Sequence, residues 1–163
     1  MPEWTRIMEA IGLAQGPERA AGRTLLRQCW EATTDEDHAQ RCVLAHYLAD
    51  TEADTEAGLD AEIGWDERAL AEHRSVRDED LRALGIASAR GFVPSLELNL
   101  ADGYHRRGDV DLARLHLKRG RAAAAALHHD GYGAMIRGGL DALGQRLAES
   151  ARQDTPTGAN GPR

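Results

Sequence analysis

Four residues of types that commonly bind metals recur at every fourth position: His38, Cys42, His46 and Asp50. Residues four apart lie on one face of a helix, so an adjacent pair of these side chains could share a zinc ion. All four could not bind one ion, because this stretch of helix spans about 18 Å. A metal site would need a ligand from another segment, such as His73. The alternative is packing, with Cys42 and His46 facing a neighbouring helix and the other two near solvent.

A second group of possible ligands, His128-His129-Asp130, falls between helical patterns and is typical of a polar loop. The glycine-rich piece at 131–133, followed by Gly138 and Gly139, has no predicted strand before it and lacks the lysine of a phosphate-binding loop. Such glycines indicate close helix packing. The sequence also has no G-x-S-x-G, C-x-x-C or H-E-x-x-H motif. It therefore predicts a protein that is not an enzyme, with no catalytic residues, no metal and no cofactor.

Helical periodicity runs through most of the chain and must position any functional side chain. In the first segment, for example, Trp4, Ile7, Met8 and Ile11 recur at intervals of three and four residues, which places them on one helical face. A capping pattern, Thr34-x-x-Asp37, marks the start of the third segment. The sequence predicts an all-α fold of about eight helices, over residues 3–14, 17–32, 35–50, 55–74, 78–90, 94–107, 110–126 and 132–149.

The stretch 94–126 carries the most specific pattern, two helical segments separated by Gly108 and Asp109. Small residues on both segments would let the two helices approach closely. The spacing resembles the tetratricopeptide repeat (TPR) family, whose motif is matched by Leu100, Ala101, Tyr104, Gly108, Asp109, Ala113, Leu117 and Gly120. Two residues differ from this motif: Glu97 stands where the family commonly has an aromatic residue, and Ala125 stands where it has a proline.

The resemblance implies an α-solenoid, a right-handed superhelix of antiparallel helix hairpins, and a scaffold that binds a peptide or protein partner. In this family the first helix of each hairpin lines the concave face. An asparagine at the place of Asn99 commonly bonds a peptide backbone or carboxylate there. The residues predicted to contact a peptide on this face are therefore Asn99, Asp102, His105, Arg106, His46 and Asp50.

The predicted array of hairpins is interrupted once. The matching pairs Leu44-Ala45 and Leu100-Ala101 are 56 residues apart, whereas regular repeats would place them about 34 apart. We therefore expect one extra helix, at 78–90, between the second and third hairpins. The segment 132–149 should cap the last hairpin, which gives a single domain over 1–150 and a disordered tail over 151–163.

The net charge of −7 is unevenly distributed. Residues 31–67 contain twelve acidic side chains against one arginine, whereas 106–121 contain six basic ones. The simpler interpretation is that both stretches form solvated faces. The alternative is a structural or regulatory module that associates through complementary charges, either with itself as a homo-oligomer or with a larger complex. Nucleic acid is not predicted as a partner, because the chain is acidic overall and no aromatic residues interrupt the basic stretch.

Compartment and redox state are predicted from the N-terminus and the cysteines. The first ten residues carry two acids, unlike a signal or transit peptide, and no window is apolar enough to span a membrane. Cys29 and Cys42 fall within amphipathic patterns, so free buried thiols are expected. These features predict a cytoplasmic protein without a membrane partner.

Overall fold

The computed structural model of the chain describes residues 2–86 and 88–153. Within these residues the fold is all-α, as predicted, and contains no strand. The helices in chain order are α1 (Trp4–Gln15), α2 (Arg19–Glu31), α3 (His38–Ala49), α4 (Glu56–His73), the short 3-10 helices η1 (Asp78–Leu84) and η2 (Ala89–Phe92), α5 (Val93–Arg107), α6 (Val110–Ala123), the 3-10 turn η3 (Ala124–Ala126) and α7 (Gly131–Gln153).

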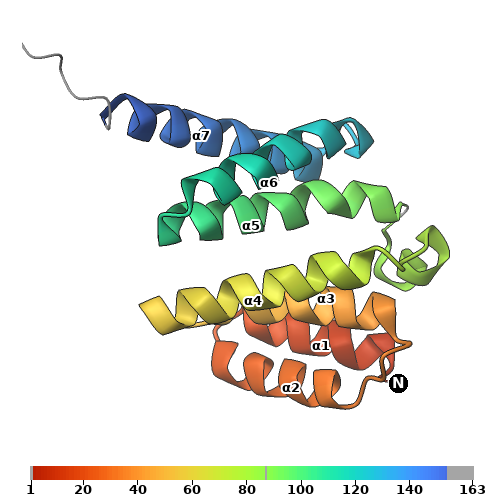
Figure 1. The fold of residues 1–163 in the computed structure, drawn as a ribbon. Coiled ribbons are helices and arrows are strands. Elements are labelled where there is room, and N and C mark those ends of the chain that lie inside the picture. The colour runs from red at the N-terminus through yellow and green to blue at the C-terminus, as the bar shows by residue number, and fades with distance from the viewer. Residues whose placement is uncertain (1, 87, 154–163) are drawn as a thin grey trace, which may run out of the picture.

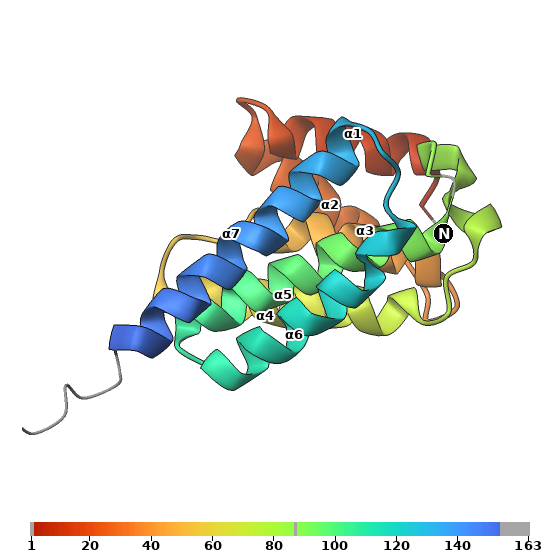
Figure 2. The ribbon, with the colours of Figure 1, turned by 90° about the horizontal axis from the view of Figure 1, so that it is seen from above.

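Consecutive helices pair as hairpins, α1 with α2, α3 with α4 and α5 with α6. Figure 1 shows these hairpins stacked in chain order, with α7 at the end of the stack. The third helix contacts the first hairpin, α5 packs on α4, and α7 lies across both α5 and α6 (Figure 2). Each helix therefore packs mainly on neighbours that are close in the sequence.

The turn of the third hairpin has the geometry that its sequence predicts. Gly108 has a φ of 89°, a left-handed conformation that favours glycine. The backbone amide of Asp109 donates to the carbonyl oxygen of Tyr104 at 2.9 Å, which closes the end of α5. The chain can then reverse within two residues and begin α6.

Two predicted helices differ from the observed ones. The third begins at His38 rather than 35, because the Asp37 carboxylate accepts from the Thr34 backbone amide at 2.8 Å and folds 34–37 into a turn. The predicted helix at 78–90 is not an α-helix but two 3-10 pieces. Gly85, with a φ of 71°, ends the first piece. The extra segment between hairpins therefore exists but is irregular.

The last helix is longer than predicted. It continues to Gln153, so residues 151–153 of the predicted tail are helical, whereas 154–163 lie outside the described residues. The N-terminal half of its apolar stripe, with Ile136 and Leu140, and the C-terminal half, with Leu143 and Leu147, are buried against the third hairpin. The last helix is therefore part of the second core, while its role as the cap of a repeat array stays a prediction.

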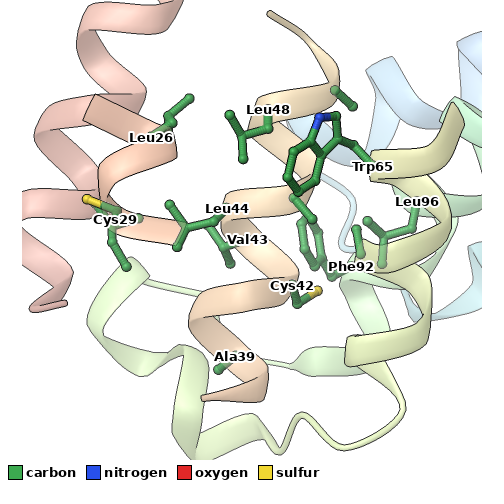
Figure 3. Packing of buried hydrophobic residues seen from close by; sticks show 14 of the residues in the cluster. Leu26, Cys29, Ala39, Cys42, Val43, Leu44, Leu48, Trp65, Phe92 and Leu96 are labelled. Atoms are coloured by element: carbon green, nitrogen blue, oxygen red, sulfur yellow. The ribbon is translucent and has the colours of Figure 1, made fainter. Parts of the chain in front are cut away.

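Apolar side chains form two cores. The first joins α1, α2 and α3 to part of α4 and to the start of α5; Figure 3 shows Leu44 of α3 pointing toward α2, with Phe92 and Leu96 on the other side of α3. The second joins α5, α6 and α7 to Ile63 of α4. Both cysteines, Cys29 and Cys42, are buried and free, which confirms the prediction.

None of the helices in the described part of the chain is both long enough and apolar enough to cross a membrane.

The close approach of α1 and α2 gives a test of this packing. A Cβ atom on Gly22 would lie 2.1 Å from the backbone nitrogen of Ala14, so Gly22→Ala forces the hairpin apart. We expect it to lower the free energy of unfolding by about 1–3 kcal/mol in urea titrations followed by circular dichroism.

Gly138→Ala is the matched control, because the space around a Cβ at this position of α7 is open. It should leave stability unchanged or raise it by up to about 1 kcal/mol through helix propensity. Equal stability of the Gly22 and Gly138 variants would contradict the packing of the first hairpin.

Candidate functional site

The α5 residues that were predicted to bind a peptide face the neighbouring helices. Asn99 is half-buried, and its side-chain amide lies 3.5 Å from Asp66 Oδ1 of α4 and 3.4 Å from His46 Nδ1 of α3. The family resemblance predicted that this amide contacts a peptide on the concave face, and that role stays a prediction. In the structure the amide lies where α3, α4 and α5 meet, because α5 packs on α4.

The other predicted α5 residues lie further along the same contact. Arg106 pairs with Glu62 of α4 and with Asp102, which also accepts from Arg146 of α7 at 2.8 Å. The Nδ1 atom of His105 is buried and has no hydrogen-bond partner among the described residues. The charged groups of Arg106 and Asp102 are thus already paired within the fold. The role of these three residues in binding stays a prediction.

Asp66 is the most unusual side chain of this contact, because it is only 1% exposed. Burial raises the pKa of its carboxyl well above 3.8, and the nearby charges of Asp50 and Glu62 add to this effect; the Asn99 amide and Arg106 oppose it. Burial likewise lowers the pKa of His46 to about 4. The two side chains lie 3.9 Å apart, and their surroundings favour the uncharged form of each.

The row of possible metal ligands on α3 matches the packing alternative. Cys42 is fully buried and burial raises its pKa to about 12, while His38 lies 2.7 Å from the Glu72 carboxylate and His73 lies 2.7 Å from the Ala89 carbonyl oxygen. Within the described residues no three His, Cys, Asp or Glu side chains are placed to hold a metal ion. In the second predicted group, Asp130 accepts from the Gly133 backbone amide and caps α7.

A cavity of about 400 Å³ opens beside His46. The ring of His46 lies edge-on to the rings of Tyr47 and Phe92, each with a centroid separation of 5.1 Å. Tyr132, in the first turn of α7, is 45% exposed at this cavity. The remaining wall comes from the link between η1 and η2 and from the chain that precedes α7: Gly85, Ile86, Ser88, Gly91, Ala126, Leu127, His128 and Asp130.

A second cavity of about 310 Å³ adjoins the first. Tyr47, Ile86 and Phe92 line both cavities, so the two are halves of one surface. We call it the apolar groove. The second cavity is lined by Met8, Ile11, Gly12 and Gln15, which share one face of α1, and by Val43 and Leu84. None of these six residues is charged.

A larger hollow of about 550 Å³ lies between the start of α3 and η1. About half of its lining side chains are charged, and four of these five are acidic. Arg77 pairs with Glu79 at 2.7 Å and with Asp80 at 3.0 Å, and His38 is engaged with Glu72. Since its one arginine is already paired with two of these acids, this hollow offers less to a peptide than the apolar groove.

Of the six predicted binding residues, only His46 lines the apolar groove; Asp50 ends α3 as an exposed residue close to Tyr47. The sequence interpretation missed Phe92, Ile86 and Tyr132, which lie in or beside segments without clear helical spacing. It also missed Asp66. A signal was present there, since Asp66 continues the intervals of four, three and four that join Leu59, Ile63 and Leu70.

Comparisons of the chain with protein-family models, curated proteins and solved structures found no match.

The buried carboxyl gives a pH-dependent prediction. In the unfolded chain Asp66 would ionise near 3.8, but its pKa in the fold is higher. Its favourable contribution is therefore complete below pH 3.8 and is lost as the pH rises through the folded pKa. Asp66→Asn cannot ionise and keeps the acceptor for Asn99, so we expect it to raise the free energy of unfolding at about pH 8 by about 1–3 kcal/mol.

The measurement is urea unfolding of wild type and variant at several pH values, with Asp54→Asn, at an exposed position, as the control. The advantage of Asp66→Asn should shrink toward about pH 4. His46 acts in the opposite sense, because its lowered pKa gives a contribution to stability that is lost as pH falls from 6.5 to about 4. Both wild type and variant contain His46, so this effect is common to the two proteins. A loss of stability by Asp66→Asn at about pH 8 would show instead that Asp66 and His46 form a buried ion pair.

Proposed function

We propose that this chain is a non-catalytic helical-repeat module that binds a peptide or protein segment in the apolar groove. The proposed architecture is a TPR-like α-solenoid in which the groove is the ligand-facing surface. The support for this architecture is the chain-order stacking of three hairpins and a final helix, together with the motif residues of α5 and α6.

The apolar groove is the observation that carries the proposal. Met8, in one cavity, is 50% exposed and Tyr132, in the other, is 45% exposed, and Tyr47, Ile86 and Phe92 line both cavities. Burying such apolar surface contributes about 25 cal/mol per Å². A segment with two or three apolar side chains would therefore gain affinity by covering the groove, with Ser88 and Asp130 available to its backbone.

The helices that form the groove are also the ones that the family resemblance favours. Part of its lining comes from α1 and α3, the first helices of the first two hairpins, and from Phe92 immediately before α5. The rest comes from the irregular segment before α5 and from the chain at the start of α7. The resemblance predicts the binding surface on the first helix of each hairpin. The irregular segment 74–92 adds Ile86 to this surface, which a regular array would not have.

The side chains with catalytic potential support binding rather than chemistry. A histidine whose pKa is about 4, as for His46, is a weak base near neutral pH. The thiol of Cys42, with a pKa of about 12, stays protonated and buried, so it is a poor nucleophile. Neither group is poised for acid–base or nucleophilic catalysis.

Two glycines give a direct test. Gly12 lies in the groove on α1, and the space around a Cβ atom there is open, so Gly12→Glu places a charge in the groove without disturbing the fold. Peptides selected from a random phage library on the wild-type protein should carry closely spaced apolar residues. Gly12→Glu should weaken their binding, measured by fluorescence anisotropy, by about tenfold or more.

Gly138→Glu is the matched control, an equal change at an open helical glycine outside the groove. It should bind the peptides as the wild type does, and both variants should match its thermal stability. Selected peptides that bind the Gly12 and Gly138 variants equally would contradict the proposal.

A further inference from the structure

The outer surface of α6 combines exposed leucines with unpaired positive charges. Leu112 is 39% and Leu115 is 40% exposed, which is unusual for leucines in this chain. Arg114, Lys118 and Arg119 are exposed on the same helix. No ion pair or hydrogen bond within the described residues engages these three side chains. The helix thus exposes apolar and cationic groups together.

This surface contrasts with the arginines of the preceding helix. Arg106 pairs with Glu62 of α4, and Arg107 pairs with Asp60 and Asp109. The basic stretch that the sequence shows is therefore divided. Its first part is neutralised by the acidic α4 inside the fold, whereas its second part, on α6, meets a single carboxylate, that of Asp141, 3.9 Å from Arg121.

A groove of about 370 Å³ runs between α6 and α7 beside these charges. Its floor is apolar, with Leu117, Leu147 and Ala148, and its charged lining consists of Arg114, Lys118 and Arg121. No acidic residue of the described chain lines it; Asp141 approaches Arg121 only to 3.9 Å and is largely exposed. We call this surface the basic groove.

We propose that the basic groove binds an acidic amphipathic segment of a partner protein. Arg114, Lys118 and Arg121 are separated by four and three residues, so they follow one face of α6 at about one-turn intervals. A partner helix with carboxylates at the same spacing would pair with them, while its apolar residues cover the exposed Ala148 beside the largely buried Leu117 and Leu147.

The charges favour a different protein over a second copy of this chain. Most acids of α4, which would be the natural counterpart, are already used within the fold, Glu62 by Arg106 and Glu67 by the Tyr104 hydroxyl. Asp60 pairs with Arg107 and Glu72 with Arg41, which leaves Glu56 at the start of the helix. The basic groove shares no lining residue with the apolar groove. A chain that uses both would join two partners, and this inference does not depend on the proposed function.

The test uses a fluorescein-labelled helical peptide of about 15 residues with glutamate at one-turn intervals beside leucine. It should bind the full chain with an affinity that falls as salt rises. Arg114→Glu combined with Lys118→Glu should weaken binding by about tenfold or more. Arg74→Glu combined with Arg82→Glu, an equal charge change at exposed positions, should leave it within about twofold. Circular dichroism spectra and melting temperatures are measured for both double variants and should show that each one folds.

Several results would overturn the proposal. One is that the glutamate peptide does not bind, and another is that the two double variants bind it equally. Equal binding of a peptide with serine in place of leucine, of a single-stranded oligonucleotide or of phosphatidylserine vesicles would show a general attraction for anions. Self-association that disappears with the Arg114 and Lys118 substitutions, measured by sedimentation velocity, would assign the surface to a second copy of the chain.

Discussion

The packing of α5 on α4 is the contact that joins the two apolar cores. Gly103 allows it, since a Cβ at that position would lie 2.9 Å from the Ile63 side chain. Around this apolar point the contact is polar, with Asn99 on Asp66, Tyr104 on Glu67 and Arg106 on Glu62. Each buried polar group left without a partner would cost about 1–3 kcal/mol. The register between the two helices is therefore specified by hydrogen bonds as much as by apolar packing.

The irregular segment between α4 and α5 determines where the apolar groove lies. It contacts α1 through η1, and at its end Phe92 packs against the ring of His46 of α3. The aromatic wall of the groove is thus a consequence of the interruption in the array. His46 lines this groove and lies 3.9 Å from the buried Asp66, so the two side chains connect the helix packing to the surface that a ligand would contact.

The sequence was sufficient for the α-helices and for the hairpin turn at Gly108, because helical spacing and left-handed glycine are local properties. It was wrong for 78–90, which forms two 3-10 pieces. It was less informative about Asn99. Whether that amide faces solvent depends on Asp66, 33 residues earlier, and a single aspartate in an acidic stretch resembles a solvated residue. The apolar groove was harder still, since Phe92, Ile86 and Tyr132 come together only through the packing of irregular segments. No local pattern encodes that arrangement.

Methyl NMR spectra of the protein, free and saturated with a selected apolar peptide, test most directly whether the groove is the ligand surface. Met8, Ile11 and Ile86 lie in the groove, whereas Ile63 and Ile136 lie in the second core and serve as internal references. The account predicts large shift changes for the first three methyl groups and little change for the references. Changes confined to Ile63, Ile136 or Met135, with the groove methyl groups unmoved, would contradict it.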